Sequence, residues 1–382
     1  MTSKILLGTT ALAAILFSTG AQAADDGLSL KMAGWFRGYA QFGSLDDNPS
    51  NGLADRRNVS FETFDSEIHF IAEAKTANGL TYGFRIELEG ASVTDQIDES
   101  YLYVKGSLGD VFFGNDDGAA NKLAYQVPAI TRSKTLVIED PNFSPNAPSG
   151  SSVKYLNSPN HYSLDSAKLF YATPRFSGFQ FGVSYAPDLS EDPNSGAVAG
   201  GFESDADVQA GDAIELGLNY SNKFGDLGLV ASVTYYTESL EDGATLATQE
   251  ERDSYAAGAG ITYKGLQFGA NYMYTDNYAA AGYTNVGVNG AELNQFVVGV
   301  QYATGPWSVG ANAGYGKVEF DGGREDEVLA LLGGVGYNVA PGLDLDAALQ
   351  YYDWDRSGGT TVANDSGSGA STALFLGTTL SF

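Results

Sequence analysis

The sequence contains no cysteine and two histidines, and it has 20 lysine and arginine residues against 47 aspartate and glutamate residues. Without cysteine, neither disulfide bonds nor thiolate chemistry is available. The formal net charge of −27 argues against nucleic acid as a partner, because contacts to phosphate need clustered basic side chains. Beyond its first residues the chain also lacks a stretch suited to a membrane helix, since glycines interrupt the longest apolar-rich run, at 328–340.

The N-terminus has the pattern of a secretory signal peptide. A single lysine precedes an apolar run that ends at Phe17, and an A-x-A cleavage site ends at Ala23. The apolar run is too short to span a bilayer, which takes about 20 residues. We therefore expect residues 1–23 to be removed on export, leaving 24–382 with a net charge of −28, because Lys4 is the one charged residue lost. Export without disulfides favours a bacterial envelope.

Glycine, tyrosine and phenylalanine are abundant, with 48, 23 and 21 copies. At the C-terminus, Leu374, Leu376, Leu380 and Phe382 fall on one face of an extended chain, and small or polar residues dominate the other face. The same alternation recurs in about sixteen segments, most of them long enough for a tilted membrane strand of about 9–11 residues. These segments lie at roughly 28–42, 64–76, 80–90, 97–106, 109–115, 166–174, 178–187, 211–221, 226–239, 252–264, 266–276, 291–304, 305–319, 326–339, 342–355 and 370–382.

The connections between these segments alternate in length. Short ones, such as 77–79 and 264–265, alternate with long ones, such as 43–63 and 188–210. This is the layout of an outer-membrane barrel. We therefore predict an all-β, sixteen-stranded transmembrane antiparallel barrel with short periplasmic turns and long extracellular loops, whose outer face contacts membrane lipid and lipopolysaccharide. The strand that ends at Phe382 should close against the first strand and leave no free edge.

From Asp98 the chain reads DESYLYVKGSLGDVFFGNDDGAA. Its acidic and aromatic strand, G-x-x-G-type turn and V-x-x-G strand leading into a long loop resemble the corresponding segment of Gram-negative general diffusion porins, particularly the alphaproteobacterial branch. The terminal Phe382 also resembles the assembly signal of that family, which implies the barrel assembly machinery as a partner. Two features depart from the family: Asn115 stands where many relatives carry a basic residue, and the P-E-F-G-G tip of the enterobacterial branch is absent.

The resemblance implies a homotrimer of water-filled pores for passive diffusion of small hydrophilic solutes and ions, with no cofactor required for transport. It also implies a third loop that folds into the lumen and narrows it. Independently, the third long connection, 116–165 (loop three), is the longest of the mature chain, and such loops are usually functional. The alternative is that loop three caps the barrel or packs against a neighbour. A substrate-specific channel and a structural or adhesive barrel also stay open.

Charged residues supply the candidate pore lining. The loop-three acids are expected at the constriction: Asp116, Asp117, Glu139 and Asp140. Arg37 and Arg85 fall on the inward face by alternation, because a charge facing lipid is costly. Basic wall residues opposite an acidic loop would set up a transverse field, or each arginine would pair with a carboxylate such as Glu67 or Glu87. We expect mild cation selectivity that weakens with salt, since the Debye length is about 8 Å at about 0.15 M.

Two further groups of residues suggest chemistry beyond a pore lining. Asp353, Asp355 and Ser357 match the first half of a calcium-binding loop, so weak binding of Ca or Mg by this loop is one expectation. Asn364 replaces the bidentate glutamate of such loops, and a solvated acidic loop is the alternative. For catalysis, His69 lies on a strand beside carboxylates, but no G-x-S-x-G motif accompanies it. The sequence therefore favours a protein that is not an enzyme.

Overall fold

A computed structural model describes residues 27–45, 58–63, 66–90, 96–133, 153, 156, 159–189, 210–240, 251–278, 291–321, 323–357 and 367–382. Its strands are β1 (Ser29–Leu45), β2 (Val59–Thr63), β3 (Glu67–Lys75), β4 (Thr81–Glu89), β5 (Ile97–Gly106), β6 (Gly109–Asn115), β7 (Ala167–Ala172), β8 (Phe179–Asp188), β9 (Ala210–Phe224), β10 (Leu227–Leu240), β11 (Asp253–Tyr263), β12 (Leu266–Asp276), β13 (Glu292–Thr304), β14 (Trp307–Phe320), β15 (Arg324–Ala340), β16 (Leu343–Ser357) and β17 (Gly367–Ser381). One short helix, α2 (Ala119–Lys122), follows β6. No described helix is long and apolar enough to cross a membrane. The expected signal peptide, Glu139, Asp140 and Asn364 lie outside these residues.

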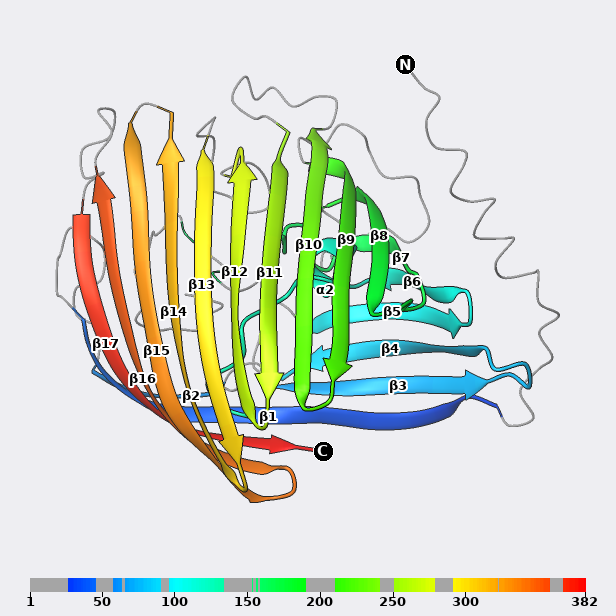
Figure 1. Ribbon diagram of the computed structural model, residues 1–382, viewed down its shortest axis with the longest axis horizontal. Coiled ribbons are helices and arrows are strands. Elements are labelled where there is room, and N and C mark those ends of the chain that lie inside the picture. The colour runs from blue at the N-terminus through cyan, green and yellow to red at the C-terminus, as the bar shows by residue number, and fades with distance from the viewer. Residues whose placement is uncertain are drawn as a thin grey trace.

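The strands form one antiparallel sheet that closes on itself (Figure 1). β17 returns to β1, with Ser381 opposite Trp35 and Ser371 opposite Leu45. The last residue completes the seam, because Gly34 and Phe382 exchange backbone hydrogen bonds of 3.2 and 3.1 Å. The expectation that the terminal strand closes the barrel is confirmed.

The seventeen named strands make a barrel of sixteen. β2 and β3 both pair with β1, in consecutive stretches that place Thr63 opposite Gly38 and Glu67 opposite Trp35. At the break between them, Ser66 Oγ accepts a hydrogen bond from the Arg37 backbone N–H at 2.9 Å. β2 and β3 therefore occupy one strand position beside β1, and the predicted strand number is confirmed.

Side chains alternate between an apolar outer surface and the interior of the barrel. On β17, Leu376 is 48% exposed, whereas its neighbour Phe375 is 1% exposed. Aromatic rings gather on the outer surface near the short turns, where Trp307 and Tyr337 have ring centroids 4.6 Å apart. Closure satisfies the backbone hydrogen bonds that a lipid environment could not, and the aromatic rings suit the membrane interface.

The turn between β3 and β4 sets the register of the site described below. Leu80 N donates to Thr76 Oγ1 at 3.0 Å, and Gly79 has a φ of +89°, a conformation that favours glycine. This turn places His69 directly opposite Glu87 on the neighbouring strand. Because side chains of opposed residues lie on the same face, both point into the barrel.

Candidate pore constriction

The described residues of loop three lie inside the barrel and run along its wall. Its helix α2 contacts β7 to β10. Three backbone N–H groups of the loop donate to serine hydroxyls on the wall: Ala119 to Ser184 on β8 at 2.9 Å, Tyr125 to Ser232 on β10 at 2.7 Å, and Arg132 to Ser308 on β14 at 3.2 Å. Ser133 Oγ then donates to Asp346 Oδ2 on β16 at 2.5 Å. The inward fold of loop three is confirmed.

The outgoing arm of loop three, residues 116–133, lies on lumen-facing glycines. A Cβ at Gly260 or Gly269 would overlap the phenol ring of Tyr125. At Gly310, an added Cβ would lie 2.7 Å from Ile130 Cα, closer than real Cβ atoms approach their neighbours. These glycines let the backbone of the loop approach the wall closely.

The return arm of loop three, described at residues 153, 156 and 159–165, packs on the same side of the barrel. Val153 and Leu156 belong to a buried cluster with wall residues that include Leu293 and Val318. Closer to β7, Asn160 Nδ2 donates to Thr234 Oγ1 at 2.7 Å. Burial of apolar side chains together with wall hydrogen bonds holds the described arms of loop three against β7 to β16.

Two ion pairs lie at the base of loop three, and the one between His161 and Asp117 joins its two arms. Lys122 Nζ lies 2.5 Å from Asp116 Oδ1, and His161 Nε2 lies 2.9 Å from Asp117 Oδ1. Burial disfavours the charged form of His161, but the adjacent Asp117 outweighs it and raises the pKa of His161 to about 9. Burial alone would raise the pKa of Asp117, yet His161 and the nearby lysines hold it at about 2. The pair is charged at neutral pH.

A third acid lies beside this pair. Burial, followed by repulsion from Asp117, raises the pKa of Asp165 to about 8. Lys168 Nζ donates to the Leu164 carbonyl at 2.5 Å and also to the backbone of Asp116. The base of loop three is therefore a compact set of charges whose protonation changes in the alkaline range.

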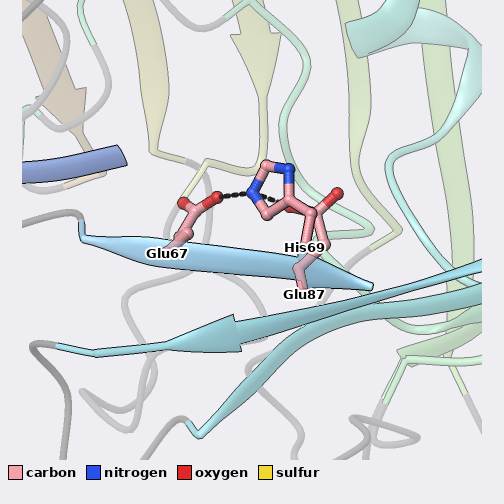
Figure 2. A group of neighbouring side chains, drawn as sticks. All are labelled: Glu67, His69 and Glu87. Carbon is pink, nitrogen blue, oxygen red and sulfur yellow. Dashed lines mark hydrogen bonds and ion pairs between the residues drawn. The ribbon is translucent and has the colours of Figure 1, made fainter. Parts of the chain in front are cut away.

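The wall formed by β3 and β4 lies about half the barrel circumference from the glycines under loop three and carries a histidine between two carboxylates (Figure 2). His69 Nε2 lies 2.5 Å from Glu67 Oε2 and 3.4 Å from Glu87 Oε2. The side chains of all three are buried, and Figure 2 shows them on the same side of the strands. Glu89 and Asp98 continue the acidic surface next to Glu67.

Both arginines singled out from the sequence lie on the inward face. Arg85 forms an ion pair with Glu87, and its Nη2 lies 2.6 Å from His69 Nδ1. Arg37 is buried, with its guanidinium 4.8 Å from the centre of the Trp35 ring. The sequence left open whether Arg85 would pair with a carboxylate such as Glu87, and in the structure it does.

Of the four loop-three acids expected at the constriction, the two that the structure describes form ion pairs within the loop. Asp116 is 2% exposed and paired with Lys122, and Asp117 is paired with His161. Their role as constriction charges stays a prediction. Sequence reasoning did not assign Glu67, Glu87 and His69 to one cluster, because that grouping depends on the β3–β4 register.

The structure places Asp353, Asp355 and Ser357, expected as the first half of a calcium-binding loop, on a strand, and binding of Ca or Mg by these residues stays a prediction. They lie on β16, which remains extended through Ser357. Successive residues of one strand face are about 7 Å apart, too far to converge on one ion as a curled loop does. Whether the loop after Ser357 binds a cation stays a prediction.

The sequence profile of the Gram-negative porins matches residues 8–357. The chain belongs to the Gram-negative porin family. It is an outer-membrane β-barrel protein, and the family and fold point to a channel rather than an enzyme. The alphaproteobacterial branch suggested by the sequence stays a prediction. No curated protein matches the chain significantly.

Solved structures share the fold of this porin. OmpT of Vibrio cholerae, an outer-membrane protein, is 15% identical, with 94% of this chain and 99% of that chain covered and a TM-score of 0.60. An anion-selective porin from Comamonas acidovorans is 15% identical, with 93% and 100% covered and a TM-score of 0.57. A porin variant from Rh. blastica is 18% identical, with 93% and 100% covered and a TM-score of 0.53. Identities this low show the fold alone.

Proposed function

We propose that this porin is a non-catalytic channel for passive diffusion of small hydrophilic solutes and ions, with a mild preference for cations. The observation that carries the cation preference is the composition of the β3–β5 wall. Glu67, Glu87, Glu89 and Asp98 gather there, with Arg85 beside them. A wall with more acids than bases attracts cations at short range, where salt screens least.

The position of loop three supports a constricted pore. Its described arms lie against β7 to β16, so the narrow path runs between the loop and the wall of β3 to β5. The selectivity of the Comamonas relative does not transfer, since pore charges differ freely among proteins of one fold.

We further propose that the chain assembles as a homotrimer in contact with lipid and lipopolysaccharide, and that the barrel assembly machinery recognises the terminal strand. The exposed Phe382, placed at the closing seam, supports the second proposal. Cross-linking of the protein in native membranes should give a trimer, and monomers alone would contradict the assembly proposal.

Reconstitution in planar bilayers tests the channel proposal. Discrete conductance steps are expected, with a zero-current potential on the cation side in a salt gradient. Blockade by one sugar at low concentration would instead indicate a substrate-specific channel, and absence of conductance from correctly folded protein would favour a structural barrel.

A further inference from the structure

We propose that Glu67, His69 and Glu87 form a binding site for a divalent transition-metal ion on the pore wall, with Zn²⁺ as the probe. One carboxylate oxygen from each glutamate and one imidazole nitrogen lie within 4.8 Å of one another (Figure 2). The part of this proposal that concerns conduction rests on the channel function proposed above, whereas the part that concerns binding does not.

The distances suit a single small ion. Zinc binds nitrogen and oxygen ligands at about 2.0–2.2 Å, so two of its ligands in tetrahedral geometry are about 3.3 Å apart. The separations of His69 Nε2 from Glu67 and Glu87, 2.5 and 3.4 Å, bracket that value. Because the three residues stand on two hydrogen-bonded strands, their spacing is set by the barrel rather than by a loop.

The ligand types select the class of metal. Calcium and magnesium prefer oxygen ligands alone, whereas zinc and neighbouring first-row ions bind imidazole well. One histidine and two carboxylates leave the remaining coordination positions to water. We therefore expect Zn²⁺ to bind more tightly than Ca²⁺.

Neighbouring charges independently favour a dication here. Glu67 also belongs to a second group, with Glu89 and Asp98, whose carboxylate oxygens lie within 4.8 Å of one another. Glu87 Oε1 is buried without a hydrogen bond and is compensated by its ion pair with Arg85. Glu67 and Glu87 are buried, and Glu89 and Asp98 are half-buried. Carboxylates this close repel one another, and a bound dication would relieve that repulsion.

Arg85 competes with the metal for this site. A guanidinium only donates hydrogen bonds, so its contact with His69 Nδ1 makes that nitrogen an acceptor and leaves the imidazole proton on Nε2. A metal on Nε2 requires the proton to move to Nδ1, which can then no longer accept from Arg85. Metal binding therefore turns Arg85 away from His69, and the positive charge of the metal takes the place of the Arg85 guanidinium next to Glu87.

Binding would also change the pore. A dication at this wall offsets the acidic groups that attract cations, and it shifts the Arg85 guanidinium, whose side chain is already 30% exposed. We expect Zn²⁺ to lower the single-channel conductance for potassium and to reduce the cation preference.

The test is titration of the purified full mature chain, folded in detergent, with Co²⁺, followed by displacement with Zn²⁺. Visible absorption of Co²⁺ bound to a nitrogen and oxygen ligand set reports the site directly. Glu67→Gln, Glu87→Gln and His69→Asn should each weaken binding by about tenfold or more, because loss of a direct ligand should cost at least as much as loss of a group that only orients a ligand, which is about 10–100-fold. Arg85→Ser should strengthen it. Glu73→Gln on the same strand face, where Glu73 accepts a hydrogen bond from Tyr103 at 2.8 Å, is the matched control and should bind normally.

The outcomes separate the claims. Equal weakening by Glu73→Gln and Glu67→Gln, no effect of His69→Asn, or Ca²⁺ displacing Co²⁺ as well as Zn²⁺ does would overturn the metal site. If one glutamine variant fails to fold, the remaining variants decide: His69→Asn should still weaken metal binding and Arg85→Ser should still strengthen it. Specific binding with unchanged conductance would overturn the consequence for the pore, and absence of conductance without any metal would instead refute the proposed channel function.

Discussion

At the scale of single residues, the side chains of β4 alternate between the outer and inner surfaces of the barrel. Phe84 and Leu88 are exposed on the outside, while Arg85 and Glu87 alternate with them on the inside. Period-two alternation was enough to predict the inward position of Arg85, because a charge facing lipid is too costly. It could not predict that His69 would lie opposite Glu87, because that pairing depends on the number of residues in the turn.

Replacing Arg85 with serine should strengthen the cation preference. A unit charge about 8 Å away in water repels a monovalent cation and attracts a monovalent anion by about 0.5 kcal/mol each, so without screening by salt the cation-to-anion permeability ratio should rise about fivefold. Zero-current potentials in a potassium chloride gradient measure the change. Lys264→Ser is the control, since Lys264 lies exposed in a short turn; an equal shift for both variants would mean that Arg85 has no special place on the ion path.

The Asp117–His161 pair should make the position of loop three sensitive to alkaline pH. His161 has a pKa of about 9, raised from 6.5, so its stabilising contribution is complete below about pH 6.5 and is lost as pH rises through 9. Asp117 has a pKa lowered from 3.8 to about 2, so its contribution is present above 3.8 and is lost only as pH falls through 2. Asp165, with a pKa of about 8, adds a negative charge in the alkaline range, while Lys168 remains nearby.

Open-channel current noise, recorded between pH 7 and pH 10, tests this dependence. Noise should increase around pH 9 as loop three loosens. His161→Asn should be noisier at pH 7 and should lose the transition near pH 9. A transition of unchanged size and midpoint in this variant would show that another group is responsible.

At the scale of elements, loop three can lie close to the barrel wall because glycines on the wall leave room for it. The resemblance to general diffusion porins implied an inward fold of loop three, and the length of the loop indicated only a functional role; neither could predict its path. The path depends on Gly260, Gly269 and Gly310 meeting particular loop residues across strands that are far apart in sequence. Gly333 on β15 is the opposite case: it alternates onto the outer face with Leu331 and Val335, and its added Cβ would meet its nearest neighbour at 3.8 Å.

Gly310→Ala should displace loop three, whereas Gly333→Ala should not. An alanine methyl at position 310 collides with the Ile130 backbone, which cannot rotate away as a side chain can. Overpacking of this kind typically costs about 1–3 kcal/mol. The single-channel conductance of the first variant should therefore change, and that of the second should match the unmodified protein; equal values for all three would contradict the described path.

The sequence located many strands closely. The expected segments 266–276 and 109–115 coincide with β12 and β6. The expected segment 64–76 was less accurate, because in the structure that strand position begins at Val59, with β2 before β3. Ser66 there bonds the backbone of Arg37, a contact between distant segments that alternation does not encode.

At the scale of the whole molecule, the barrel presents its apolar surface outward and its polar groups inward. Leu376→Arg should lower the free energy of unfolding in lipid by about 2–4 kcal/mol, because it places a charge on the lipid-facing side of β17. Leu376→Ala keeps the position apolar and is the control. Folding titrations in lipid vesicles measure both variants, and equal losses would mean that this face does not meet the membrane core.

The central claim is that this porin encloses a water-filled path narrowed between loop three and the acidic wall of β3 to β5. The most direct measurement is the current through single molecules of the mature protein in a planar bilayer, under a salt gradient. We expect discrete open-channel steps and a cation-side zero-current potential that moves toward zero as salt rises. Correctly folded protein that shows no steps, or a zero-current potential on the anion side, would contradict this account.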